Sequence, residues 1–577
     1  MTATPDPSNQ PVLIGNIHKI QGNQIEVSAA PELMQQIHDG LSDRLKLFET
    51  GSILTIPYSG HQLYAFATGS AYQNTQSGHL PSILLSATLF GESRDAQTNT
   101  ESAFHRGIST YPVLQTQAYS TTKDNLTRIY STDQTQGLEL GTYKGVTDMP
   151  CTLDVNGLLS QASTVIGSSG TGKSATTAAI LHALLELGPA QNLPHWQPRI
   201  IIIDPHGEYH GSFPDHIRLC STDSTLTLPY WLLDLQELIH LLIDPQSRTA
   251  LSESDILRRA LIRVRQEAAD HYNYQAAQVT ADSPVPFMLG SSDSFNELGR
   301  ESGNSLYIEG LIGKINLERP NTLDKDKHEL YNRLIYKIEL LKADARLAFI
   351  MRESTIYESE APLQDIIGQL IDTAGKPVII DLSGLPQEIA SVLCGAIART
   401  IFNLKIWQSE TERKKSPVLL VCEEAHRYAG QHLDYQSSSA QTAIRRIAKE
   451  GRKYGLGLML VSQRPSELDE TALSQCTTWI VLRLNNEKDL AQVEALLPDT
   501  FAPLAALLPG LQMREALLVG TATKMPANIM IRKLPADKLP ASSSTDFVAG
   551  WQQGPLNPEQ IHQAVMRWVH HERLEPM

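Results

Sequence analysis

The sequence predicts an α/β protein that begins with a small β-barrel and is interrupted by a helical insertion. Three observations indicate this fold class. Short β segments with frequent turns fill the first part of the chain, a Gly-rich turn then joins an apolar run to an Ala/Leu-rich stretch, and further apolar runs ending in polar residues follow. A chain of 577 residues is also too long for one hydrophobic core, so about three or four domains are expected.

The first predicted domain covers residues 1–130. From about residue 11 to 125, short β segments are separated by Gly, Ser, Pro and Asn; examples are QIEVSA, GSILTIPYSG, QLYAFAT and SILLSATLFG. Many short strands with frequent turns are typical of a small barrel or sandwich. We therefore expect an N-terminal β-barrel.

An α/β core is predicted for residues 131–228 and 357–534. The run RIIIID begins a parallel sheet, which resumes with PVIIDLSGLP, VLLVCEEAH, GLGLMLVSQRP and TTWIVLRLNN. Such continuous apolar strands are typical of parallel sheets that are buried on both faces.

Residues 229–356 interrupt this pattern, because apolar residues there recur at helical spacing. The recurring residues are Leu257, Leu261, Val264, Leu330, Leu334, Ile338, Leu341 and Ala345. A helical insertion is predicted. Residues 535–577 are predicted to form a Pro/Ser-rich linker and a last amphipathic helix, which begins at Asn557 and Pro558 and carries Ile561, Val565 and Trp568 on one face.

Composition limits where the protein acts and what it binds. The net charge of -15 argues against binding nucleic acid over the whole surface, but it leaves room for a local basic channel. The five cysteines show no CxxC pair or zinc spacing, which indicates reduced thiols. No signal peptide and no membrane-spanning run is evident, so we expect a cytoplasmic protein with no membrane contact.

The stretch VIGSSGTGKSATT carries the clearest chemistry. Gly167, Gly172, Lys173 and Ser174 match the P-loop pattern GxxxxGK[ST] between an apolar strand and a helix. Glycines let backbone N–H groups turn toward phosphate oxygens, and the helix N-terminus adds its dipole. Lys173 is predicted to reach the β and γ phosphates of ATP, and Ser174 to bind Mg²⁺. The predicted nucleotide-binding residues are Gly167, Ser168, Ser169, Gly170, Thr171, Gly172, Lys173, Ser174 and Ala175.

Two adjacent acids, Glu423 and Glu424, follow the apolar run VLLVC. Taken alone, the Glu-Glu-Ala-His step is typical of the first turn of a solvated helix, where acids favour the positive end of the helix dipole. Because the same chain contains a P-loop, we favour a catalytic role for these two acids. Glu423 is then predicted to hold the Mg²⁺ shell, and Glu424 to orient and deprotonate the attacking water as the general base.

Several motifs together resemble the HerA family of hexameric ATPases, relatives of FtsK in the RecA-like class: GSSGTGKS, DPHGEYHG, EEAHRY and RRIAKEGRKYGLGLMLVSQRPSEL, with the β domain in front of them. The resemblance covers about residues 5–530. It implies a RecA-like P-loop motor that forms a homohexameric ring, hydrolyses ATP at subunit interfaces and drives double-stranded DNA through a central pore. It also implies an effector partner, either a NurA-like nuclease or a sirtuin-like or other protein, in DNA-end processing or anti-phage defence.

The resemblance assigns roles to two further residues. Gln463 matches the polar residue that senses the γ-phosphate, and Arg452 is our choice for the arginine that reaches across the subunit interface, with Arg445 and Arg446 in reserve. The sequence departs from the family at two places. LLSQAST, before the P-loop, lacks a basic residue that many relatives have, which puts a second arginine from the same subunit in doubt, and Arg514 stands where a glycine is common.

Three alternatives stay open. In DPHGEYHG, the alternating Asp204, His206, Glu208 and His210 suggest a metal site, but Pro205 and Gly207 favour a hydrogen-bonded turn. The basic residues near Arg452 can form a solvated helix face, or they can contact DNA or ATP. The whole ring can be an ATP-regulated scaffold for an effector enzyme, or a motor that acts on protein or single strands, instead of a motor for double-stranded DNA.

Overall fold

A computed structural model describes most of the chain, and the described residues form two compact units. The first contains residues 1–194, 461–466 and 476–534, and the second contains residues 195–460, 467–475 and 535–577. Within these limits the structure describes residues 11–38, 48–73, 82–94, 104–130, 137–144, 149–221, 225–290, 310–319, 325–351, 353, 359–431, 438–541, 547–552, 554 and 557–570.

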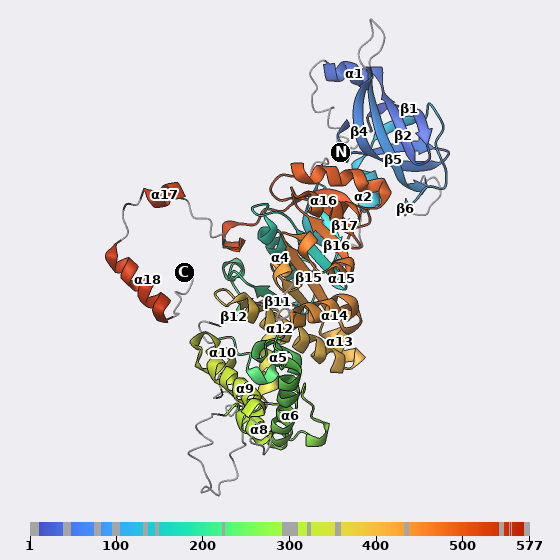
Figure 1. Ribbon diagram of the computed structural model, residues 1–577. Coiled ribbons are helices and arrows are strands. Elements are labelled where there is room, and N and C mark those ends of the chain that lie inside the picture. The colour runs from blue at the N-terminus through green and yellow to red at the C-terminus, as the bar shows by residue number, and fades with distance from the viewer. Residues whose placement is uncertain are drawn as a thin grey trace. The chain divides into compact units, whose positions relative to one another are not determined.

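The first unit begins with a closed antiparallel barrel (Figure 1). Its strand order is β2-β1-β7-β3-β4-β5-β6, and an additional pairing of β2 with β5 closes it. Alternate residues face the core, as in β2, where Ile25 and Val27 are buried. The elements are β1 (Leu13–Gln21), β2 (Gln24–Ala29), α1 (Pro31–His38), β3 (Ile53–Tyr58), β4 (His61–Gln73), β5 (Ser82–Arg94), β6 (His105–Arg106), β7 (Gln117–Ser120) and α2 (Lys123–Tyr130).

The remainder of the first unit holds a mixed sheet in the order β10-β16-β17-β18-β8-β9. Strands β10 and β16 are parallel, and each later neighbour is antiparallel. The elements are β8 (Gly137–Tyr143), β9 (Pro150–Asp154), α3 (Val155–Leu159), β10 (Ala162–Ile166), α4 (Lys173–Ala190), β16 (Cys476–Val481), α16 (Glu487–Glu494), the 3₁₀ segment Asp499–Gly510, β17 (Glu515–Gly520) and β18 (Ala527–Ile531). Strand β17 runs antiparallel to β16, so the first residue of β17 lies at the edge of the sheet where β10 and β16 end.

The second unit contains a parallel sheet in the order β12-β13-β11-β14-β15. Its strands are β11 (Arg199–Asp204), β12 (Ile217–Cys220), β13 (Val378–Asp381), β14 (Val418–Cys422) and β15 (Leu456–Ser462), and the last two residues of β15 belong to the first unit. Every residue of β13, β14 and β15 is buried, as expected for strands covered on both faces.

Helices surround this sheet, namely α11 (Pro362–Ile371), α12 (Gln387–Trp407), α13 (Glu410–Lys415), α14 (Ser438–Tyr454) and α15 (Glu470–Ser474). Among the helices that the structure describes, α12 alone is long and apolar enough to cross a bilayer. Its apolar window is 72% buried inside the protein, which is typical of a core helix.

The helical insertion predicted from sequence is present in the second unit. It contains α5 (Leu235–Leu242), α6 (Ala250–Ala269), α8 (Leu311–Leu317), α9 (Lys325–Ala343) and α10 (Ala348–Met351). The apolar positions that indicated helices, such as Leu257, Leu261 and Leu334, are buried. The α/β fold class with an N-terminal barrel and a helical insertion is therefore confirmed. The C-terminal part contains α17 (Phe547–Trp551) and α18 (Pro558–His570), whereas linker residues 542–546 lie outside the described residues.

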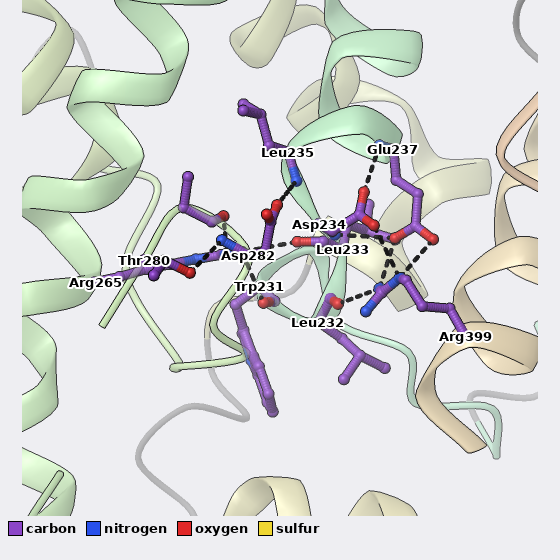
Figure 2. Close-up of polar contacts among 11 residues, drawn as sticks. Trp231, Leu232, Leu233, Asp234, Leu235, Glu237, Arg265, Thr280, Asp282 and Arg399 are labelled. Atoms are coloured by element: carbon purple, nitrogen blue, oxygen red, sulfur yellow. Dashed lines mark hydrogen bonds and ion pairs between the residues drawn. The ribbon is translucent and has the colours of Figure 1, made fainter. Parts of the chain in front are cut away.

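Two arginines, one fully buried and one partly buried, connect the insertion to helix α12 (Figure 2). Arg265 of α6 is 0% exposed, and its Nη2 donates to the carbonyls of Trp231 (3.1 Å) and Leu233 (2.7 Å). Burial lowers the pKa of Arg265 to about 10, so its guanidinium stays charged at neutral pH. Arg399 of α12 donates from Nη2 to the carbonyl of Leu232 (2.8 Å). The turn at residues 231–233 is therefore held from both sides, and we call this arrangement the arginine clamp.

Glu237 supplies the more buried of the two carboxylates in the arginine clamp, and Asp234 supplies the other, with its Oδ2 3.1 Å from Arg399 Nε. Arg399 donates to both oxygens of Glu237, at 2.9 and 2.7 Å, and Glu237 also closes a capping box with Asp234 at the start of α5. Burial raises the pKa of Glu237, and the adjacent Arg399 opposes this effect. Bidentate pairs of this kind combine charge with fixed geometry, so removing one partner leaves a buried charge without compensation.

We expect Arg399→Gln to destabilise the region around α5, because Glu237 then remains buried without its cation. Loss of one partner of a buried pair costs about 3–5 kcal/mol. Hydrogen exchange of the α5 amides should accelerate accordingly. The double variant Glu237→Gln/Arg399→Gln is the matched control, and it should recover part of the protection. Exchange in the double variant as fast as in Arg399→Gln would contradict this account.

Candidate active-site residues

The phosphate loop lies between β10 and α4, as predicted. Gly170 and Gly172 have φ of 75° and 93°, a region that glycine adopts without steric cost. Gly167 donates its N–H to the carbonyl of Ser462 (3.3 Å), and Ser168 donates to that of Arg483 (3.0 Å). The loop is thus anchored to the last residue of β15 and to the segment that follows β16, within the first unit.

The loop has the features that a bound phosphate requires. Gly172 is the N-cap of α4, a helix of 18 residues, and no side chain caps it. A Cβ on Gly170 would meet nothing within 4 Å, so the loop surface is open there. Backbone N–H groups and the helix dipole therefore offer a site for an anion. The residues fit the triphosphate of ATP.

The residues also fit Mg²⁺ in the form that nucleotide sites use. Mg²⁺ takes one or two protein oxygens together with phosphates and waters. In the first unit, Ser174 in the first turn of α4 has a hydroxyl oxygen of the type that such a site uses. In the second unit, the Glu423 carboxylate is also of a ligand type that Mg²⁺ accepts. Among the described residues there is no group of three or more His, Cys, Asp or Glu side chains that could hold a metal, so the transition-metal reading of DPHGEYHG has no support.

Gln463 directly follows Ser462, the residue whose carbonyl accepts the Gly167 N–H. Two arginines lie at this edge, of which Arg483 was missed from sequence and Arg514 was noted only as a departure from the family pattern. Arg483 holds Ser168 through its carbonyl, and Arg514 lies against Gly172, since a Cβ there would be 4.0 Å from the Arg514 nitrogen. Position after a parallel strand was an available signal for Arg483, because β16 is parallel to β10 and ends at the same edge.

DPHGEYHG forms the hydrogen-bonded turn that was favoured over a metal site. The carboxylate of Asp204 accepts the backbone N–H groups of His206 (3.1 Å), Gly207 (2.9 Å) and Tyr209 (2.9 Å). Burial raises the pKa of Asp204 to about 6, while these hydrogen bonds oppose the shift. Neighbouring Asp381 differs: burial would raise its pKa, but hydrogen bonds from Ser383 and Arg218 hold that pKa below its ordinary value.

Glu423 and Glu424 are buried, at 4% and 7% exposure, so they do not begin a solvated helix. Glu423 accepts a hydrogen bond from the Tyr209 hydroxyl. Glu424 has φ of 48°, an uncommon conformation for a residue other than glycine, and precedes a short 3₁₀ turn, Ala425–Arg427. His426 lies 3.3 Å from the Glu424 carboxylate. Two adjacent acids are therefore held in different environments.

The basic residues of α14 divide into two groups. Arg445 pairs with the buried Asp469, and Arg446 stacks over the ring of Phe402 at 4.7 Å. These two side chains are used within the subunit. Lys449, Glu450, Arg452 and Lys453 line an open hollow of about 590 Å³ near the end of the helix. Arg452 is exposed, and its side chain has no hydrogen bond or ion pair to any residue that the structure describes.

Residues 138–401 match the family described as the central domain of the helicase HerA. The chain is 28% identical over 454 residues to the DNA double-strand break repair helicase HerA of Pyrococcus furiosus, with 72% of each chain covered. It is 26% identical over 451 residues to the protein of the same name from Saccharolobus solfataricus, with 77% of each chain covered. Among solved structures, the plasmid coupling protein TrwB with a non-hydrolysable ATP analogue is 14% identical, with a TM-score of 0.46, covering 73% of this chain and 94% of that one.

We expect Gly167→Ala to impair nucleotide binding, because the added Cβ would lie 2.6 Å from Thr171 Oγ1 and 2.8 Å from Leu482 Cβ. The loop must shift, and misplacement of about 1 Å at a reacting site typically costs about 10²-fold in rate. Steady-state ATP hydrolysis measures the effect. Gly368→Ala in α11 is the matched control, since nothing lies within 4 Å of its added Cβ. Normal hydrolysis by Gly167→Ala would show that the loop tolerates the shift.

Proposed function

Because the chain belongs to the HerA family of P-loop ATPases, we propose that it uses ATP hydrolysis to move double-stranded DNA. The observation that carries this proposal is the presence, in one chain, of an anchored phosphate loop and two adjacent buried acids at the end of a parallel strand. Two relatives are named DNA double-strand break repair helicases, which supports DNA as the substrate. Contacts to phosphates instead of bases would make movement independent of sequence.

The residues of this chain have distinct proposed roles. Lys173 and the N-terminus of α4 bind the phosphates and stabilise the charge that develops on them. Ser174 and Glu423 hold Mg²⁺, which supplies further neutralisation of phosphate charge when it is bound. Glu424 orients the attacking water and accepts its proton, with His426 beside its carboxylate. Gln463 senses the γ-phosphate.

The proposed assembly is a homohexameric ring that acts with an effector protein. The net charge of -15 means that DNA contacts must be local, and a ring would repeat the exposed cations of α14 six times around a channel. We propose that the barrel region, residues 1–130, docks the effector, a nuclease or another enzyme. The relatives' role in double-strand break repair favours DNA-end processing as the setting, with anti-phage defence as the other setting of this proposal.

The proposed roles predict that two variants fail differently. Lys173→Ala should abolish ATP binding, because the loop itself contains no second cation. Glu424→Gln should bind ATP but hydrolyse it about 10²- to 10⁴-fold more slowly, as expected when a general base is removed. Equilibrium binding of a fluorescent ATP analogue and steady-state hydrolysis separate the two steps. Equal loss of binding in both variants would contradict these roles.

Duplex DNA tests the motor itself. We expect double-stranded DNA to stimulate hydrolysis by the wild-type protein but not by Glu424→Gln. A ring that assembles with an effector yet shows no stimulation by duplex DNA would instead indicate a scaffold in which ATP acts as a switch. Stimulation by single strands alone would contradict the proposed substrate.

Arg452 is proposed to act on the nucleotide of a neighbouring subunit. Its exposure and its place beside an open hollow favour it over Arg445 and Arg446, which have partners within the subunit. Arginines supplied in this way are typically worth about 10³ to 10⁵ in rate. Arg452→Ala should therefore form hexamers and bind ATP while losing hydrolysis, as measured by native mass spectrometry, ligand titration and steady-state assays.

Mixed rings distinguish action across an interface from action within a subunit. Arg452→Ala and Glu424→Gln subunits, each inactive alone, should recover some hydrolysis when mixed, because a few interfaces then combine an intact Glu424 with a neighbour's intact Arg452. Two outcomes would contradict the proposed role of Arg452: mixed rings that recover no hydrolysis despite proven subunit exchange, or wild-type hydrolysis by Arg452→Ala alone. In either case the α14 cations would become candidates for DNA contact.

A further inference from the structure

A strained arginine lies directly beside the phosphate loop. Arg514 precedes β17, at the edge of the first unit's sheet where β10 ends. A Cβ placed on Gly172 would be 3.8 Å from Met513 Cγ and 4.0 Å from the backbone nitrogen of Arg514. The turn that carries Arg514 therefore touches the residue at which α4 begins.

The backbone of Arg514 has φ of 66°, in the left-handed region that glycine adopts readily. Strain of this kind persists only where the surroundings impose it, and it is concentrated at functional sites. The backbone carbonyl of Arg514 accepts a hydrogen bond from β18, donated by the N–H of Ile531 at 2.9 Å. Glu515, the next residue, accepts the N–H of Gln512 at 3.0 Å and is fixed by Asn528 at 2.8 Å. The conformation is thus imposed from several sides.

A glycine at this position would satisfy the backbone without strain, so the arginine side chain needs its own explanation. Arg514 is half-buried, and its Nη1 donates to the carbonyl of Ile531 at 3.2 Å. A guanidinium carries five N–H donors in a planar fork suited to phosphate oxygens. The bond to Ile531 uses one donor and fixes the position of the group.

The phosphate loop has few cations of its own, so Arg514 could help to balance the charge of a bound nucleotide. Within the loop, Lys173 is the one cation, and the segment LLSQAST before it contains no basic residue. A triphosphate carries several negative charges, and charge-assisted hydrogen bonds from arginine are among the strongest available to balance them. We propose that Arg514 binds the phosphates of the nucleotide held by its own subunit's phosphate loop. This inference rests on the proposed ATPase function and adds a cation from the same subunit to it.

The test compares nucleotide affinity with the stability of the nucleotide-free protein. Arg514→Gly removes the charge and relieves the backbone, and Arg514→Asn removes the charge with a residue that also tolerates positive φ. Both should weaken binding of a fluorescent ATP analogue by about tenfold or more, without a marked fall in the unfolding temperature of the nucleotide-free protein. Arg514→Lys, which keeps the charge, should bind more tightly than either.

Lys524→Gln is the matched control. Lys524 is an exposed cation in the turn between β17 and β18, at the opposite end of this hairpin from Arg514, so its removal should leave binding unchanged. Wild-type affinity in Arg514→Gly or Arg514→Asn would overturn the inference. A large fall in the unfolding temperature of both nucleotide-free variants would also overturn it, because the arginine would then serve the fold.

The proposed function and this inference fail in distinguishable ways. If the wild-type protein binds no ATP, the proposed function fails and the role of Arg514 falls with it. If the wild type binds ATP, Lys173→Ala does not, and the Arg514 variants bind normally, the proposed function stands and the inference alone is wrong.

Discussion

The carboxylate of Asp204 organises the acidic edge of the second unit's sheet. It is 1% exposed and binds the N–H groups of His206, Gly207 and Tyr209. Burying a charge is costly unless hydrogen bonds replace the lost water, and here the chain supplies three of them. The turn after β11 is fixed as a result, and the fixed turn places the Tyr209 hydroxyl against Glu423.

This arrangement gives the two neighbouring acids different surroundings. Glu423 has its orientation set by Tyr209 in the turn after β11, whereas Glu424 lies in a strained backbone conformation with an imidazole beside it. Carboxylates in different environments can serve different steps of one reaction. The proposed roles, metal binding by Glu423 and proton transfer by Glu424, would make use of this difference.

Arginine serves several separate purposes in this chain, and burial and partners distinguish them. Arg265 and Arg399 fix the insertion to α12: the buried Arg265 binds carbonyls, and the partly buried Arg399 binds a carbonyl and the Glu237 carboxylate. Arg445 is paired with Asp469, whereas Arg452 extends into solvent at the end of the same helix. A cluster of like residues in the sequence therefore need not share one role.

Local physics allowed the sequence to determine the strands of the parallel sheet, the helical insertion and the phosphate loop. A continuous apolar run indicates a strand buried on both faces, and apolar residues at helical spacing indicate a helix with one buried face. The GKS motif after a strand indicates a glycine-rich loop that binds an anion. Tertiary structure alone decided which side chains meet. Tyr209 and Glu423 are 214 residues apart, and Arg514 approaches Gly172 only because β17 runs antiparallel to β16. Strand order and direction bring such residues together, and no periodicity or motif in the sequence records that order.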